Sequence, residues 1–326
     1  MVITDLEEQR NETLRSAYAE GTKSNLETHW DSYREFCHIY RDDKLQTTVE
    51  SLSLYIQFLS NRLKSPGAIK NYVSGVKTMH VINDLSIECF DDFLIRMMMR
   101  GVTVRKKHKP KKAKPMTPEL LKRIHTTIDM TQANDCTFWA LFVTAFYLLA
   151  RKSNLVPDSV KKFNPGKQLT RGDVEVTEKA LLVTLKWSKT NQVGREEVFP
   201  LLKNKKSILC PAAAYKRMIK EFPAKDASPA FMIKKFGKLQ PVTYRQYQAR
   251  IKKAMLDVGE DPEGYTSHSF RRGGATYAFK CGVSAGMIKR LGDWKSDAYL
   301  EYIDFPIEDR ITAGQKIRKN INKLKK

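Results

Sequence analysis

The stretch His268–Tyr302 reads HSFRRGGATYAFKCGVSAGMIKRLGDWKSDAYLEY and holds several side chains that can act on a phosphate group. His268 and Arg271 stand three residues apart, so a helix would place them on one face, with Cβ atoms about 5–6 Å apart. Such a pair can bind one phosphate. The Gly292-Asp293-Trp294 run indicates a helix break that presents an indole N–H donor, and Tyr302 follows with an ionisable hydroxyl. This order predicts attack by a tyrosine on a phosphodiester.

The net charge of the chain favours a polyanionic partner. Its 326 residues include 58 Lys and Arg against 36 Asp and Glu, a net charge of +22. So large an excess attracts nucleic acid. The N-terminal sequence MVITDLEEQR has no signal-peptide hydrophobic region, and no run of about 18 apolar residues occurs, so we expect no membrane partner.

The cysteines and histidines give no support for a metal site or a cofactor. The sequence contains no Cys-x-x-Cys pair, no His-Glu-x-x-His spacing, no EF-hand loop and no Gly-rich phosphate loop. An odd, scattered set of cysteines also argues against a disulfide framework and predicts reduced thiols in an intracellular protein. We therefore expect no cofactor. The five cysteines are Cys37, Cys89, Cys136, Cys210 and Cys281.

Residues 1–101 carry only helical patterns and are predicted to form a domain of their own. Apolar residues recur at helical spacing in four segments, and Pro66 with Gly67 fits the start of the third. Four helices of this size predict a small bundle. The predicted helices are Lys23–Tyr40, Val49–Arg62, Ala68–Val81 and Phe90–Gly101.

Residues 102–115 are predicted to be a solvated basic linker. The segment is too charged and too interrupted by proline to pack as a core element. It is either a simple tether or a strap across the DNA backbone, and it also has the composition of a nuclear-import patch. The basic residues expected to contact DNA are Arg105, Lys106, Lys107, Lys109, Lys111, Lys112 and Lys114.

Residues 116–326 are predicted to form a mostly helical domain with a small sheet. Thr117 is the expected N-cap of a helix that has Pro118 at its first position and runs to about Ile128. An apolar helix, Cys136–Ala150, then ends at Arg151. A hairpin is predicted from Ala180–Trp187 and Glu197–Leu201, which flank Ser188–Gly194, with Thr170–Val176 as a third strand. Further helices are predicted at Ala212–Glu221, Thr243–Val258, Ser269–Cys281, Ala285–Leu291 and Ala298–Ile303.

These motifs strongly resemble the tyrosine recombinases, a family of DNA strand-exchange enzymes. The family has His-x-x-Arg, then Leu-Gly-His or Leu-Gly-x-Trp, then a tyrosine nucleophile about two helical turns later. Here the elements are His268–Arg271, Leu291–Trp294 and Tyr302. The Arg-Arg-Gly-Gly-Ala-Thr and Gly-Asp-Trp-x-Ser-Asp-Ala-Tyr runs are most similar to recombinases of eukaryotic mobile elements of the Crypton, Ngaro and DIRS type.

The resemblance implies a two-domain fold and a metal- and ATP-independent reaction. An all-α four-helix core-binding domain that clasps DNA would precede a mostly α catalytic domain with a small antiparallel sheet. The enzyme would cleave and rejoin double-stranded DNA through a 3′-phosphotyrosine, as a dimer or tetramer on DNA. Such a protein from a eukaryotic element would act in the nucleus.

The resemblance also assigns roles to six residues. Arg151 and Arg271 would stabilise the negative charge that develops on the phosphate, because a guanidinium presents a planar fork of donors. Lys189, on the hairpin turn, would protonate the leaving 5′-oxygen, with Lys186 as the fallback. His268 would act as general base or phosphate donor, Trp294 as an indole donor and Tyr302 as nucleophile.

Two departures from the family pattern leave alternatives open. Tyr302 lies eight positions after Trp294, where most relatives use nine, and Tyr299 competes with it for the role of nucleophile. Asn154 occupies the place where many relatives have an acidic residue that orients the first arginine. An amide can accept a hydrogen bond from Arg151 without charge assistance, so a clamp that tightens only in an assembled complex is one hypothesis.

Three functions remain compatible with the sequence. The first is a recombinase or transposase that integrates or excises a mobile element. The second is a type IB topoisomerase-like enzyme, which shares the chemistry but acts alone. The third is a domesticated, non-catalytic DNA-binding protein. The C-terminal run Gln315–Lys326 is either a helix that docks on a neighbouring protomer or a frayed basic tail.

Overall fold

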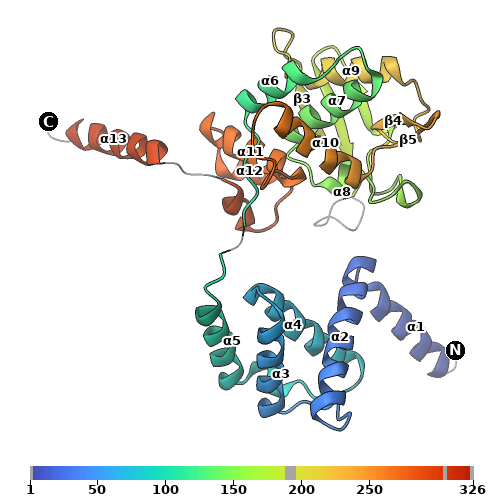
Figure 1. Ribbon diagram of the computed structural model, residues 1–326, viewed down its shortest axis with the longest axis vertical. Coiled ribbons are helices and arrows are strands. Elements are labelled where there is room, and N and C mark those ends of the chain that lie inside the picture. The colour runs from blue at the N-terminus through green and yellow to red at the C-terminus, as the bar shows by residue number, and fades with distance from the viewer. Residues whose placement is uncertain (1–2, 110, 188–195, 304–306, 324–326) are drawn as a thin grey trace. The chain divides into compact units, whose positions relative to one another are not determined.

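The computed structural model describes residues 3–109, 111–187, 196–303 and 307–323. The chain divides into two compact units, Met1–Pro110 and Lys111–Lys326, called here the N-terminal and C-terminal units (Figure 1). Each has a hydrophobic core of its own. None of the helices within the described ranges is long and apolar enough to cross a bilayer.

The N-terminal unit is helical throughout its described residues. Its elements are α1 (Ile3–Ser16), α2 (Glu20–Tyr40), α3 (Val49–Arg62), α4 (Pro66–Ile82), the 3₁₀ helix η1 (Glu88–Asp91) and α5 (Phe93–Lys106). Tyr33, Phe36, Tyr55 and Leu59 lie at the centre of a core that α2 to α5 share. Helical spacing on α2 and α3 aligns these residues on the inner faces, so the apolar pattern of the sequence accounts for the packing.

Local capping sets where these helices begin. The Thr48 hydroxyl accepts a hydrogen bond from the Ser51 amide, and the Ser51 hydroxyl accepts from the Thr48 amide, which forms a capping box at α3. Ser65 caps α4 ahead of Pro66, with its hydroxyl accepting from the Ala68 amide. The predicted span of α3 agrees with the structure at both ends.

Two features of this unit differ from expectation. The acidic helix α1 precedes the four predicted helices. In addition, α5 continues to Lys106, so Arg105 and Lys106 are helical and do not belong to an extended linker. The Lys106 ammonium donates to the Ser60 carbonyl at 2.6 Å, and this contact joins the basic last turn of α5 to α3.

The C-terminal unit surrounds the apolar helix α7 (Figure 1). Its helices are α6 (Pro118–Thr127), α7 (Ala133–Tyr147), α8 (Lys152–Leu155), α9 (Pro211–Glu221), α10 (Tyr244–Asp257), α11 (Ser267–Lys280), α12 (Ala285–Leu291) and α13 (Ile307–Lys323), with 3₁₀ helices η2 (Val160–Lys162), η3 (Arg171–Asp173) and η4 (Asp297–Tyr302). The Thr117 cap of α6 is as predicted, with its hydroxyl accepting from the Leu120 amide at 3.2 Å. The segment predicted as a helix at Ala298–Ile303 is instead the 3₁₀ helix η4.

Two small antiparallel sheets complete this unit. The first has the order β1 (Val174–Val176), β2 (Ala180–Leu185), β3 (Glu197–Leu202), with Val183 opposite both Val174 and Phe199. The predicted hairpin is therefore present, but its turn at 188–194 lies outside the described residues, and the third strand begins only at Val174. The second sheet, β4 (Met232–Lys235) with β5 (Lys238–Pro241), was not predicted. Its two-residue turn has Phe236 and Gly237 at positive φ, and phenylalanine is not a usual residue there.

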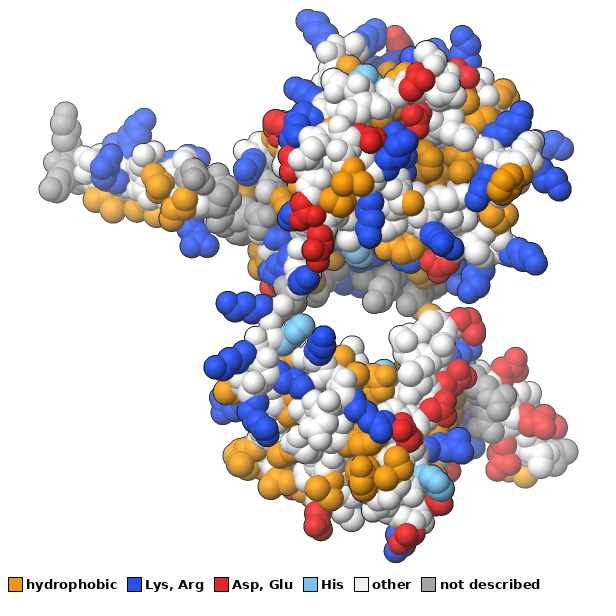
Figure 2. All heavy atoms as spheres, in the orientation of Figure 1, with side chains coloured by type: hydrophobic (Ala, Val, Ile, Leu, Met, Phe, Trp, Pro, Cys, Tyr) orange, Lys and Arg blue, Asp and Glu red, His pale blue; other side chains and the backbone are white. Residues whose placement is uncertain are grey.

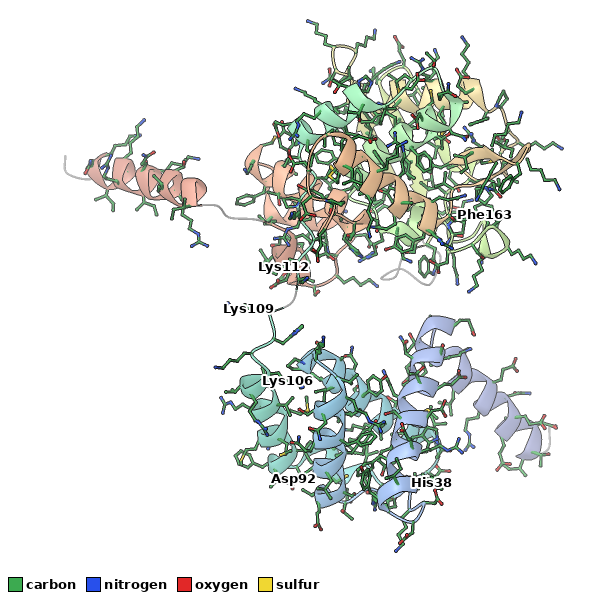
Figure 3. All side chains as sticks on the ribbon, viewed as in Figure 1. His38, Asp92, Lys106, Lys109, Lys112 and Phe163 are labelled. Atoms are coloured by element: carbon green, nitrogen blue, oxygen red, sulfur yellow. The ribbon has the colours of Figure 1, made fainter. Side chains whose placement is uncertain are left out.

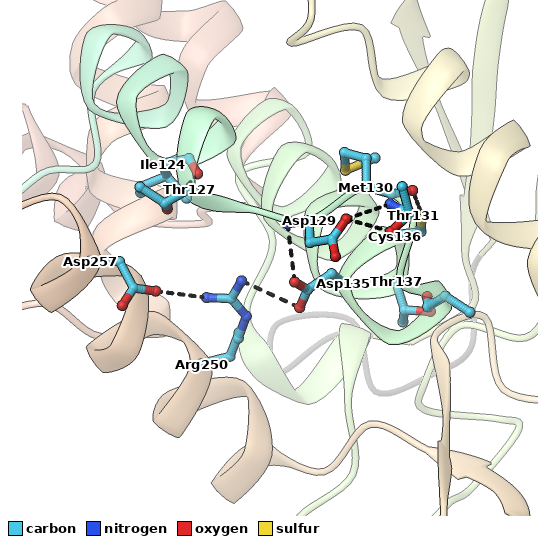
Figure 4. A network of polar contacts seen from close by, with 11 residues as sticks. Ile124, Thr127, Asp129, Met130, Thr131, Asp135, Cys136, Thr137, Arg250 and Asp257 are labelled. Carbon is cyan, nitrogen blue, oxygen red and sulfur yellow. Dashed lines mark hydrogen bonds and ion pairs between the residues drawn. The ribbon is translucent and has the colours of Figure 1, made fainter.

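A buried arginine fixes α10 against α7. Arg250 lies 3.3 Å from the Asp135 carboxylate and 3.9 Å from that of Asp257, while Asp135 also accepts from the Asp129 amide (Figure 4). Two carboxylates satisfy the charge that burial would otherwise leave uncompensated. Loss of Arg250 would therefore remove the charged contact that joins α10 to Asp135 on α7.

The first residues of the C-terminal unit cross α11 closely. The Lys114 amide donates to the Gly264 carbonyl at 2.8 Å, and the Met116 amide donates to the Ser269 carbonyl at 2.9 Å. Gly273 makes this crossing feasible, because a Cβ atom there would lie 1.7 Å from the Met116 carbonyl oxygen. We call residues 111–116 the strap.

Candidate active site

Arg271 lies at the centre of the site and is only 2% exposed. It stands on α11 and donates to the carbonyl of Leu149 and, at 2.6 Å, to the carbonyl of Gly292. Leu149 follows α7 with a φ of +49°, a strained conformation for a non-glycine residue. Helix α7 therefore ends at Tyr147, three residues before the predicted end. The backbone turn after α7 provides an acceptor for the buried guanidinium.

Arg151 emerges after that turn, as the N-cap of α8. Its guanidinium donates to the Asp293 carboxylate at 3.0 Å and to the Asp293 backbone carbonyl at 3.1 Å. The two side chains are 18% and 21% exposed, so each retains access to solvent. The pair joins segments 142 positions apart in the sequence.

Trp294 and Tyr302 form an aromatic wall beside Arg271. The Arg271 guanidinium carbon lies 3.8 Å from the Trp294 ring centroid and 5.6 Å from that of Tyr302. The two rings are 5.3 Å apart. A guanidinium over an aromatic face gains cation–π attraction, which is stronger when the groups are shielded from water. The structure thus shows the packing part of the dual role expected for Trp294, and its role as an indole donor stays a prediction.

The two candidate tyrosines differ in environment. Tyr299 is 8% exposed and belongs to a small core with Leu149, Ala275 and Ile288. Tyr302 is half-buried, and the guanidinium carbon of Arg271 lies 5.6 Å from its ring centroid. Of the two, Tyr302 is therefore the one brought together with the arginine.

Helix α11 also holds the backbone of η4, a function that the sequence did not reveal. The Arg272 guanidinium donates to the Glu301 carbonyl at 3.2 Å, and the Thr276 hydroxyl donates to the Tyr302 carbonyl at 2.9 Å. Both side chains come from the Arg-Arg-Gly-Gly-Ala-Thr run. Arg272 stands one residue after Arg271 and Thr276 five residues after it, and this placement is the only signal of the contact in the sequence. Two anchors on consecutive carbonyls fix the position of the Tyr302 backbone.

Positive charges dominate the electrostatics of the site. Desolvation lowers the pKa of Arg271, and the nearby charge of Arg151 lowers it further, whereas Tyr302 and Asp293 act in the opposite direction. The pKa of His268 is lowered as well. The main cause is partial desolvation of the imidazole, and the positive charges of Arg271, Lys152 and Arg151 lower it further. His268 lies in the first turn of α11 with an exposed side chain. A neutral imidazole beside an electropositive pocket can accept a proton.

The lysine of the site is only partly defined. Lys189 lies outside the described residues. Lys186 pairs with the Asp173 carboxylate at 2.7 Å, and that carboxylate also accepts from the Thr170 amide at the start of η3. This network ties Lys186 to the sheet.

Asn154 makes a contact that the sequence did not suggest. Its side-chain amide is directed at the Trp187 carbonyl, 2.6 Å away, and the residue is 2% exposed. The carboxylate that binds Arg151 is that of Asp293. Asn154 therefore holds the end of the β2 side of the hairpin, two residues before Lys189 in the sequence.

The basic residues expected to bind DNA lie in three different settings (Figure 3). Arg105 and Lys106 end α5, and Lys107 and Lys109 are exposed beyond it. The three strap lysines instead pair with acidic residues of the C-terminal unit. These pairs are Lys111 with Glu263 at 3.0 Å, Lys112 with Glu301 at 2.5 Å and Lys114 with Asp261 at 3.4 Å.

Comparison with known proteins gives structural neighbours but no match by sequence. No protein-family model matches the chain, and no curated protein does. The Tn1549 transposon integrase in complex with transposon right end DNA has a TM-score of 0.63 at 15% identity, covering 98% of this chain and 100% of that one. The XerH site-specific recombinase bound to palindromic difH substrate has a TM-score of 0.61 at 13% identity, covering 96% and 84%.

A lambda integrase dimer bound to a COC′ core site gives a TM-score of 0.57 at 15% identity, covering 95% of this chain and 96% of that one. The C-terminal unit matches the fold of the tyrosine recombinase catalytic domain. The fold brings together Arg151, Arg271, Trp294 and Tyr302, and it places His268 at the start of α11. The identities are too low to carry more than the fold.

Proposed function

We propose that the protein is a site-specific DNA recombinase that cleaves and rejoins duplex DNA through a covalent link between Tyr302 and a 3′-phosphate. The observation that carries the proposal is the position of Tyr302 beside Arg271: the guanidinium carbon lies 5.6 Å from the centroid of the Tyr302 ring. Arg151 and Arg271 both donate to the Gly292–Asp293 turn. A nucleophile and two fixed cations are the minimum set for phosphoryl transfer without a metal.

The chain's residues account for each proton and charge in the reaction. The Tyr302 oxygen forms a bond to phosphorus as the bond from phosphorus to the 5′-oxygen breaks, and the phenolic proton passes to neutral His268. Arg151 and Arg271 stabilise the charge on the non-bridging oxygens. The leaving 5′-oxygen takes a proton from Lys189. Because a phosphodiester is exchanged for a phosphotyrosyl ester, the reverse step rejoins DNA without ATP.

A second copy of the chain fits the proposal through α13. This helix carries basic side chains and four exposed isoleucines, and Figure 2 shows its apolar side chains gathered along one edge. An exposed apolar stripe indicates a docking surface. The helix would bind a neighbouring protomer on DNA, which favours the docking interpretation of the C-terminal run over a frayed tail. The isoleucines are Ile307, Ile311, Ile317 and Ile321.

The biological setting follows from the resemblance described above. The substrate would be the termini and target site of a mobile element of the Crypton, Ngaro or DIRS type, and the reaction its integration or excision. The enzyme would then act in the nucleus of the host.

Trapping on nicked suicide DNA tests the function. Incubation with duplexes that carry candidate element-terminal sequences should give a protein–DNA band that survives denaturing electrophoresis. Tyr302→Phe removes the attacking oxygen and should abolish the band, whereas Tyr299→Phe, a matched loss of one hydroxyl, should keep it. No band with the wild-type protein would contradict the proposal, and so would a band retained by Tyr302→Phe.

Sizing of the protein–DNA complexes separates recombination from topoisomerase-like activity. Recombination requires two or more protomers on the paired sites. A monomer that relaxes supercoiled DNA would instead identify a type IB topoisomerase-like enzyme, and a protein that binds DNA without forming the band would be a non-catalytic binding protein.

A further inference from the structure

The Gly292–Asp293 turn binds both arginines of the site. The Gly292 carbonyl accepts from Arg271 at 2.6 Å, and the Asp293 carbonyl accepts from Arg151 at 3.1 Å. The Asp293 carboxylate adds a second contact to Arg151 at 3.0 Å. Two consecutive carbonyls and one carboxylate therefore set the spacing and the planes of the two guanidiniums.

The conformation of the turn explains how two neighbouring residues serve two arginines. Asp293 has a φ of +50°, in the left-handed region that aspartate tolerates better than most side chains. Gly292 is required because a Cβ atom there would lie 1.6 Å from the Trp294 ring. The turn thus places Trp294 under Arg271 and the Asp293 carboxylate on Arg151 at the same time.

The site has two like charges close together, and a carboxylate is the natural counter-charge. Arg151 disfavours the charged form of Arg271, and Asp293 favours it. Without a negative group, repulsion would push the more exposed of the two guanidiniums, that of Arg151, towards solvent. A hydrogen bond between charged partners resists this better than a neutral one.

We propose that Asp293 is the positioning residue for Arg151 and holds the two arginines ready for a phosphate before DNA arrives. The inference rests on the proposed function, since it concerns the same site. Asp293 accepts hydrogen bonds from two of the five guanidinium N–H donors of Arg151, and its proposed role is to hold that guanidinium rather than to contact the phosphate. It supplies the acidic partner whose expected place in the sequence is filled by Asn154, which is directed at Trp187 instead.

The test compares single-turnover cleavage of suicide DNA at saturating concentration. Asp293→Asn keeps the size of the side chain and the backbone contact but removes the charge, and should slow cleavage about tenfold. Asp297→Asn is the matched control, because Asp297 is an exposed acid of the same segment that pairs with Lys289 at 3.0 Å. It should change the rate by less than about twofold.

A second arm shows whether Asp293 acts through Arg151. In an Arg151→Lys background, the planar pairing with Asp293 is already lost, so adding Asp293→Asn should cost less than about twofold. A full tenfold loss in both backgrounds would mean that Asp293 acts on something else, and would overturn the inference. Equal melting temperatures and equal DNA affinity of Asp293→Asn and wild type exclude a simple folding defect.

The outcomes also separate this inference from the proposed function. If the wild-type protein forms no covalent complex, the proposed function fails. If it forms one and Asp293→Asn cleaves at the wild-type rate, only the inference fails. Faster cleavage by Asp293→Asn would show that the carboxylate restrains Arg151 and would likewise overturn it.

Discussion

The almost fully buried guanidinium of Arg271 is stabilised at both of its terminal nitrogens and on one face. Carbonyl groups accept from its two terminal nitrogens, and Trp294 covers its face. Burial without such partners would be costly for a charged group. The arginine is therefore preorganised before DNA binds, and its orientation does not have to be found during the reaction.

His268 should give the cleavage reaction a pH dependence that begins below the usual histidine range. Its pKa is lowered from 6.5, so the neutral form that accepts the Tyr302 proton persists on acidification to below pH 6.5. We expect the second-order rate of cleavage, which reports the free enzyme, to fall on acidification with a midpoint below pH 6.5.

Measurement of that rate with subsaturating suicide DNA between pH 5 and 8 checks the expectation. His268→Gln should lower the rate and remove the acid limb of the profile. A midpoint above pH 6.5 for the wild type would contradict the role given to the neutral imidazole.

At the scale of elements, the crossing of the strap over α11 depends on Gly273. A methyl group there would meet the backbone of Met116, which cannot move aside as a flexible side chain would. We expect Gly273→Ala to destabilise the protein by about 1–3 kcal/mol, as overpacking does elsewhere. Gly286→Ala in α12 is the control, because nothing lies within 4 Å of its Cβ position.

Urea unfolding measures the free energy of both variants. Gly286→Ala should be neutral or stabilising, since alanine favours a helix by up to about 1 kcal/mol over glycine. Equal stability of the two variants would show that α11 and the strap separate more easily than their contacts imply.

The same elements show which parts of the structure could be predicted from sequence. Helix starts at Thr48 and Thr117 depend on neighbouring residues alone, so local patterns located them. The predicted end of α7 was wrong because Leu149 adopts a positive φ. Its carbonyl accepts a hydrogen bond from Arg271, a residue far along the chain. The Phe236-Gly237 hairpin lacked the usual turn residues. Local signals therefore predict elements well, except where a distant residue imposes the backbone conformation.

The candidate site followed the same rule. The motif residues were evident because their order and spacing are preserved in one segment, whereas the partner of Arg151 was not. Asn154 is near Arg151 in sequence and Asp293 is 142 positions away, yet Asp293 accepts two hydrogen bonds from the Arg151 guanidinium. Such a pairing depends on the tertiary fold and leaves no periodic trace in the chain.

At the scale of the whole molecule, the basic segment between the units should contribute unequally to DNA binding. Lys107, Lys109, Lys111 and Lys112 are all exposed, but Lys111 and Lys112 also pair with the carboxylates of Glu263 and Glu301. Each phosphate contact contributes about 0.9 to the slope of log affinity against log salt. A lysine that exchanges a carboxylate for a phosphate releases less net counterion than one that does not.

We therefore expect Lys107→Gln with Lys109→Gln to reduce the salt slope by up to about 2, and Lys111→Gln with Lys112→Gln to reduce it less. Fluorescence anisotropy with a labelled duplex at several salt concentrations measures both pairs, which remove the same charge. If the Lys107→Gln with Lys109→Gln variant leaves the slope unaltered, the basic segment between the units does not bind the DNA backbone through these two lysines.

Cysteine exposure has a practical consequence for such measurements. Cys281 follows α11 and is exposed, whereas the other four thiols are buried, at Cys37, Cys89, Cys136 and Cys210. A maleimide dye added to the native protein will therefore label one position, at the end of α11 opposite to His268. That position is about 20 Å away along the helix axis. The arrival of a dye-tagged duplex can thus be followed in real time without engineering a cysteine.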